Sequence, residues 1–103
     1  MDLSDIFHAI RANRIRITSH AQKEAQADGL TLEQIYTSVI RGEMIKEYPD
    51  DRPYPSCLIL GFTVAGQAVH SVWAYNSENR FAVLITVYRP DPNLWENFRE
   101  RKK

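Results

Sequence analysis

The sequence predicts an α+β fold, in which N-terminal helices pack on one face of a four-stranded antiparallel sheet and a further helix ends the chain. Two observations support this prediction. Residues 57–88 contain three apolar runs rich in β-branched and aromatic residues, CLILGFTV, AVHSVWAY and FAVLITVY, separated by the turn segments AGQ and NSENR. Residues 3–41 instead place apolar side chains at helical spacing, next to residues that favour helix ends.

The size and composition are those of one small domain. A chain of 103 residues with 44% hydrophobic content can bury one core, so we expect a single domain over residues 1–103. No apolar run approaches the roughly 18 residues of a membrane span, and the first residues lack the apolar segment of a secretory signal. The single cysteine, Cys57, lies in a predicted strand, where we expect a buried thiol. These features favour a cytoplasmic protein.

The charges balance but are unevenly distributed. Thirteen basic residues oppose thirteen acidic ones, which argues against a protein that coats nucleic acid. Residues 24–56 carry the acidic excess, whereas both ends of the chain are basic. A neutral chain can therefore still present one basic surface.

The first two elements follow from periodicity. Residues 3–12 place Leu3, Ile6, Phe7 and Ile10 on one stripe, which predicts a helix. The segment RIRIT at residues 14–18 alternates with period two and predicts a short edge strand whose arginines face water.

Two more helices are predicted from their end signals. Ser19 begins a helix that Asp28 and Gly29 end through a left-handed cap. Thr31 and Gln34 form a capping box for the next helix. Because all three helical segments are amphipathic, they must cover another element.

The rest of the chain frames the sheet. Residues 43–48 (EMIKEY) predict its first strand, and the proline-rich segment PDDRPYPS then runs extended. That segment is either a binding loop offering Arg52 and Tyr54 or a solvated connection. Residues 93–103 predict a C-terminal helix, whose basic end suits the helix dipole.

The sheet faces depend on loop lengths. A two-residue hairpin loop at Ala65 and Gly66 would place Gly61 opposite His70. Leu58, Leu60, Phe62, Val69, Ser71, Trp73, Phe81, Val83, Ile85 and Val87 would then form the core face. His70 would project from the opposite, more polar face into accessible space near Tyr88.

The candidate functional residues lie on this second face and at one helix start. His70 has the ordinary pKa that proton transfer near neutrality requires. Thr86, Tyr88 and Arg89 end the last strand within reach of it. His20 begins a helix, where free backbone N–H groups favour an anion. Each of these side chains also has a purely structural interpretation.

Metal and cofactor motifs are absent from the sequence. No CxxC, HxH or HExxH spacing occurs, and no glycine-rich phosphate loop or dinucleotide fingerprint is present. We therefore expect neither a metal nor a cofactor.

The ordered set ITSHAQKEAQADGLTLEQI, GEMIKEYPDDRPYPSCLILGFTVAGQAVHSVWAY and ITVYRPDPNLWE resembles the family called domain of unknown function 4258. The resemblance runs from about Arg16 to Trp95. Its diagnostic pieces include His20 with Ala21, His70, and the segment at residues 85–88 followed by Pro90. Many members carry arginine where this chain has Glu24.

This family looks like a distant relative of the RelE/ParE-like toxins, small α+β proteins with two N-terminal helices on one face of an antiparallel sheet. The resemblance implies metal-independent RNA cleavage restrained by an antitoxin. It would make His70, Tyr88 and His20 catalytic and Arg89, Arg52, Tyr54 and Thr86 substrate-binding. RNA and an antitoxin are the implied partners.

Three classes of function stay open at this point: a toxin-like ribonuclease, a non-catalytic module that binds a protein, and a small-molecule enzyme. The segments at residues 14–18 and 43–48 also offer edge strands through which a homodimer could form.

Overall fold

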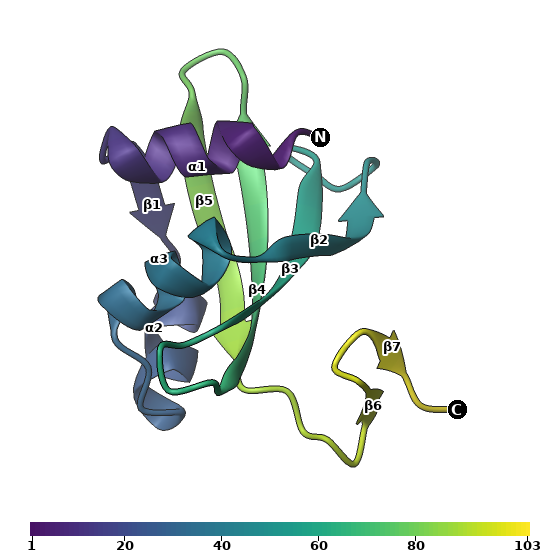
Figure 1. Cartoon of the computed structure of the whole chain (residues 1–103). Helices are drawn as coiled ribbons and strands as arrows, with labels where there is room; N and C mark the ends of the chain where they lie inside the picture. Colours follow the sequence, from purple (N-terminus) through teal and green to yellow (C-terminus); the bar gives the residue numbers. More distant parts are fainter.

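The computed structural model describes residues 1–103 (Figure 1). Its elements are α1 (Leu3–Arg11), β1 (Ile15–Ile17), α2 (Ser19–Ala27), α3 (Leu32–Ile40), β2 (Glu43–Tyr48), β3 (Ser56–Phe62), β4 (Ala68–Asn76), β5 (Phe81–Tyr88), β6 (Trp95–Glu96) and β7 (Glu100–Arg101). The predicted α+β class is confirmed. The sheet is five-stranded and mixed, in the order β1-β5-β4-β3-β2, so the prediction of four antiparallel strands was wrong. The difference is β1, which pairs in parallel with β5.

The three helices begin and end where the local signals place them. Thr18 caps α2 by accepting from the backbone N–H of Ala21, and Thr31 and Gln34 form the predicted capping box of α3. Gly29 follows α2 with φ of 64°, the left-handed conformation that glycine adopts without steric cost. No helix combines the length and apolar character that crossing a membrane requires.

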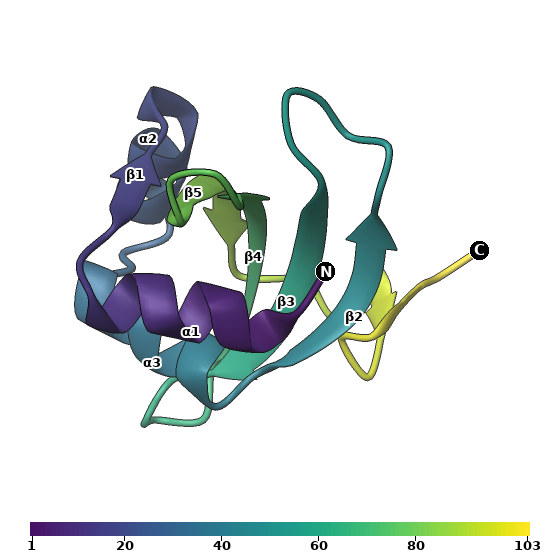
Figure 2. The same ribbon diagram turned by 90° about the horizontal axis from the view of Figure 1, so that it is seen from above.

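The helices cover one face of the sheet, with α1 and α3 across its middle and α2 beside β5 (Figures 1 and 2). The buried cluster between helices and sheet contains Ile6, Ala9, Ala21, Ala25, Leu30, Ile35, Val39, Cys57, Ile59, Val69, Trp73, Ala82, Leu84 and Val87. Cys57 is fully buried there, and burial raises its pKa to about 11. Its thiol therefore stays protonated and unreactive near neutrality.

The predicted register of β3 against β4 was wrong by one residue. Five residues, Thr63–Gln67, connect the strands instead of two, since Phe62 pairs with Ala68. His70 therefore lies opposite Leu60, and Gly61 lies opposite Val69. Because side chains alternate between faces, this shift turns Leu58 and Leu60 away from the helices and brings Cys57 and Ile59 toward them.

The core positions of β5 also differ from the prediction. Asn76 pairs with Phe81, and the register shifts by one residue between Val72 and Trp73 of β4, with Ile85 as the extra residue of β5. Ala82, Leu84 and Val87 consequently enter the core cluster, while Phe81, Val83 and Ile85 do not. Thr86 and Tyr88 share the helix-free face with His70, because Val72 pairs with Thr86 and His70 pairs with Tyr88.

The predicted C-terminal helix is absent. Residues 93–103 form a small hairpin of β6 and β7, closed by a hydrogen bond from the Arg99 N–H to the Glu96 carbonyl (2.9 Å). Asn97 and Phe98 at its turn have φ of 50° and 60°, which a right-handed helix excludes. In this conformation Phe98 meets Phe62 edge to face (6.5 Å between ring centroids), and Trp95 meets His70.

We predict that Gly61→Ala strongly destabilises the fold. An added Cβ would lie 1.8 Å from the Ser38 carbonyl oxygen of α3, a backbone atom that cannot move without displacing the helix. The expected loss of unfolding free energy in urea is about 3 kcal/mol. Val64→Ala, at an 84% exposed position in the next loop, is the control, with an expected change below about 0.5 kcal/mol. Equal stability of the two variants would contradict this contact.

Candidate active site

His70 and Tyr88 meet on the helix-free face of the sheet. They are direct partners across β4 and β5, and the Tyr88 hydroxyl lies 3.2 Å from His70 Nδ1. The two rings pack edge to face with centroids 5.3 Å apart. The expected proximity of these two side chains is therefore present, although the space around His70 is not open.

The last part of the chain, residues 89–103, which we call the strap, covers His70. Figures 1 and 2 place the strap away from the helices. His70 Nε2 lies 2.7 Å from the Phe98 carbonyl oxygen, and the Trp95 ring packs edge to face on the imidazole at 4.5 Å. As a result His70 has 0% exposure. Because a carbonyl oxygen only accepts, Nε2 carries the proton and Nδ1 accepts from Tyr88.

Burial shifts both members of this pair toward their neutral forms. It lowers the pKa of His70, an effect that the hydrogen bond to Phe98 partly offsets. It also raises the pKa of Tyr88; Tyr48 and Glu24 add to that increase, whereas the positive charge of Arg101 opposes it. A neutral imidazole and a protonated phenol therefore face each other under the strap near neutral pH.

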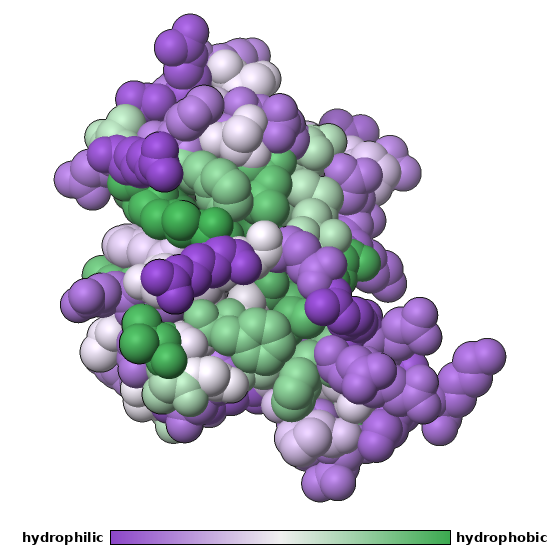
Figure 3. All heavy atoms as spheres, in the orientation of Figure 1, coloured by the Kyte–Doolittle hydropathy of each residue, from purple (hydrophilic) through white to green (hydrophobic).

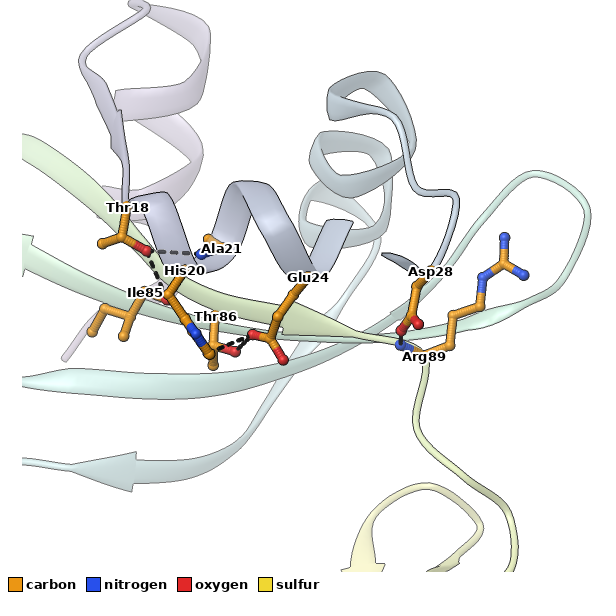
Figure 4. A network of polar contacts seen from close by, with 8 residues as sticks. All are labelled: Thr18, His20, Ala21, Glu24, Asp28, Ile85, Thr86 and Arg89. Atoms are coloured by element: carbon orange, nitrogen blue, oxygen red, sulfur yellow. Dashed lines mark hydrogen bonds and ion pairs between the residues drawn. The ribbon is translucent and has the colours of Figure 1, made fainter. Parts of the chain in front are cut away.

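A second group of polar side chains lies at the edge of the same face, where α2 passes β5 (Figure 4). His20 Nε2 is 2.8 Å from a Glu24 carboxylate oxygen one helical turn away, and the Thr86 hydroxyl donates to the same oxygen. The His20 side chain is 68% exposed. When Nε2–H donates to Glu24, Nδ1 is left to accept a proton from a ligand.

This group exists because β1 is short. β1 pairs only with Ala82, Val83 and Leu84 of β5, so α2 takes the edge of β5 beyond that point. The Thr18 hydroxyl caps α2 and also donates to the Ile85 carbonyl (2.9 Å), which fixes the start of the helix against the strand. From there Glu24 reaches Thr86 on the helix-free face.

The other expected site residues lie elsewhere. The backbone N–H of Arg89 donates to Asp28 (2.8 Å), and its guanidinium points away from His20 and Thr86 (Figure 4). Arg52 is exposed in the loop between β2 and β3. Tyr54 in that loop accepts from Asn76 at the far end of β4 (3.0 Å), six residues and roughly 20 Å along the strand from His70.

Sequence reasoning missed Glu24, Trp95 and Phe98. Glu24 had a usable signal, because residues four apart on a helix are neighbours and His20 with Glu24 is such a pair. The two strap residues gave no such signal, since their contacts with His70 depend on a turn with two positive φ angles.

A hollow lies on the helix-free face next to this site. An open hollow of about 550 Å³ has Val72 and Ile85 as apolar lining and Tyr48 at its side, with the carboxylates of Glu47, Asp50 and Asp51 around it. No group of three or more histidine, cysteine, aspartate or glutamate side chains could hold a metal ion.

The buried His70 makes stability depend on pH. Because its pKa in the folded chain is below the ordinary 6.5, its neutral form stabilises the fold fully above pH 6.5, and this contribution is lost as the pH falls through the folded value. We predict that the unfolding free energy in urea, relative to that of His70→Gln, is constant above about pH 7 and falls on acidification. A difference that rises on acidification would contradict the burial of a neutral imidazole.

Comparison with known proteins gives one match. Residues 17–89, more than half of the chain, match the model of the family described as domain of unknown function (DUF4258). The matched region contains α2, His20, Glu24, His70 and Tyr88, and it ends at the first strap residue. No curated protein and no solved structure shows a significant match. The resemblance noted in the sequence is therefore confirmed, and the chain belongs to the DUF4258 family.

Proposed function

We propose that this protein is a toxin-like, metal-independent ribonuclease restrained by an antitoxin protein. The observation that carries the proposal is the exposed His20, oriented by Glu24, whose partner Thr86 shares the helix-free face with the protonated phenol of Tyr88. A base and an acid on one face of the sheet are what cleavage of RNA by its own 2′-hydroxyl needs.

In this proposal His20 acts as the base. Its Nδ1 takes the proton of a ribose 2′-hydroxyl, whose oxygen then attacks the adjacent phosphorus. Glu24 positions the imidazole and stabilises the charge that it gains, since the carboxylate lies 2.8 Å from Nε2. Thr86 holds Glu24 in place through its hydroxyl.

Tyr88 acts as the acid. Its raised pKa keeps the phenol protonated. In the closed structure that proton points to His70 Nδ1 at 3.2 Å, so the hydroxyl turns from Nδ1 to the leaving 5′-oxygen when it acts as the acid. The products would be a 2′,3′-cyclic phosphate and a free 5′-hydroxyl.

The start of α2 supplies the positive potential for the phosphate. The first N–H groups of a helix have no intrahelical partner, and the helix dipole favours an anion there. His20 is the second residue of α2. Neither Arg89 nor Arg52 has to stabilise the transition state for this arrangement to work.

The architecture supports the proposal by analogy. Helices on one face of a sheet resemble the arrangement that a RelE/ParE-like relationship implies, whereas the parallel strand β1 departs from its antiparallel sheet. Because one fold can host many functions, the main support for the proposal is the dyad of His20 and Glu24.

A second candidate function rests on the hollow beside the site. Its three carboxylates suit a basic side chain of a protein partner better than an RNA phosphate. In that case the domain would bind a protein without catalysis. Growth arrest on expression would then persist in His20→Ala and be lost in Asp50→Lys, a change at an exposed position.

For the ribonuclease we predict that the purified protein cleaves end-labelled single-stranded RNA in the presence of EDTA. His20→Ala should lower the rate by about 100-fold or more, the usual contribution of a positioned acid or base. His8→Ala, an exposed histidine of α1, is the matched control and should cleave at the wild-type rate. Tyr88→Phe should also slow cleavage.

The product ends distinguish this reaction from contamination. Cleavage should leave 2′,3′-cyclic phosphates, and RNA with a single 2′-deoxynucleotide at the cut site should resist. Absence of cleavage by the wild type, or equal rates for His20→Ala and His8→Ala, would refute the proposed function.

A further inference from the structure

We propose that the strap, residues 89–103, is a displaceable cover of the site: it closes the pair of His70 and Tyr88 and opens locally while the rest of the fold stays intact. In the closed state the Phe98 carbonyl takes the place of a ligand oxygen on His70 Nε2. The effect on activity rests on the proposed function, whereas the movement does not.

In the closed state His70 has defined contacts with the strap. Nε2–H of His70 is satisfied by the Phe98 carbonyl at 2.7 Å, and the Trp95 ring covers the imidazole. No buried polar side-chain atom is left without a partner. A phosphate or ribose oxygen of a substrate is also an acceptor, so it would compete with the Phe98 carbonyl for the same N–H.

Beyond that contact the strap packs one aromatic ring on the sheet, since Phe98 meets Phe62 edge to face at a position that is 42% exposed. No strap residue belongs to the core cluster beneath the helices. Its hairpin has only two residue pairs, and an ion pair between Arg99 and Glu43, both about half exposed, ties it to β2. Exposed ion pairs contribute little to stability. Phe98 at φ of 60° also adopts a conformation that is unfavourable for a bulky side chain.

These properties are those of a segment with low local stability. Regions with few buried apolar contacts open at a lower free energy than the whole fold. The sheet does not need the strap, because β2 to β5 are held by their own ladders and by the helical core. Opening would therefore expose His70 and Tyr88 on an intact face.

The positive charge at the end of the strap indicates that a polyanion such as RNA favours the open state. Arg99, Arg101, Lys102 and Lys103 oppose the single acid Glu100 at its end. Figure 3 shows this end of the molecule, at lower right, as predominantly hydrophilic. A segment of this charge is attracted to a phosphate backbone, so RNA that binds it would also stabilise the open strap.

The test measures the accessibility of His70 in the full chain. Diethyl pyrocarbonate modifies exposed imidazoles, and peptide mass spectrometry separates His8, His20 and His70. In the wild type we expect slow modification of His70 at a rate that stays constant through low urea concentrations, because only local opening is needed. A rate that rises with urea in parallel with global unfolding would overturn the proposal.

Two strap variants provide the matched comparison. Trp95→Ala removes the ring over His70 and should raise its modification rate by about tenfold or more. Leu94→Ala changes the neighbouring 44% exposed side chain and should leave the rate unchanged. Equal His70 rates in the two variants, with both chains folded by circular dichroism, would refute the strap as the cover.

RNA cleavage by the same proteins separates the two proposals. If the ribonuclease is real, Trp95→Ala should cleave faster than Leu94→Ala, and an equal or slower rate would refute the inhibitory role of the strap. If no protein cleaves RNA while His70 accessibility follows the strap, the proposed function fails and the displaceable cover stands.

Discussion

The close approach of α3 to Gly61 fixes which face of the sheet is which. The Ser38 backbone lies where a side chain at position 61 would have to be, so β3 turns its glycine to the helices. Cys57 and Ile59 accompany it, and Leu60 points the other way with its partner His70. A single backbone contact thus determines that the imidazole lies outside the helical core.

Because His70 lies on the helix-free face, the helices cannot cover it. The strap does so with a carbonyl and an indole ring. Tyr88 connects this covered pair to the exposed group around His20, since it lies two residues after Thr86 on the same face and Thr86 donates to Glu24. His70 is covered by the strap, whereas His20 at the start of α2 is exposed. The strap therefore controls the access of water to His70 but not to His20.

Most of the elements could be predicted because their signals are local. The capping box of Thr31 and Gln34, the left-handed Gly29 and the strand from Glu43 to Tyr48 are each encoded within a few residues. The parallel pairing of β1 could not be predicted in this way, because its partner lies more than sixty residues away. The strap was mistaken for a helix because Trp95 and Phe98 are three residues apart, a spacing that suits both structures.

The faces of the sheet were harder to predict than its strands. One misjudged loop moved the predicted core of β3 to the wrong side, and the loop before β5 did the same for Phe81 and Val83. The extra residue at Ile85 then returned Val87 to the core face, as predicted. His70 reached the correct face, but opposite Leu60 rather than Gly61. Its proximity to Tyr88 was predicted, but their direct pairing was not. The link from His20 to Thr86 through Glu24 could not be predicted either, because it depends on where α2 passes the edge of β5.

A neutral His70 is held between Tyr88 and the strap on the helix-free face. Long-range ¹H–¹⁵N correlation spectra of the histidine rings at neutral pH test it most directly. The account predicts the Nε2–H tautomer for His70, with an observable, slowly exchanging proton that shows Overhauser contacts to Trp95 and Phe98. A rapidly exchanging ring, or the Nδ1–H tautomer with no contact to the strap, would contradict it.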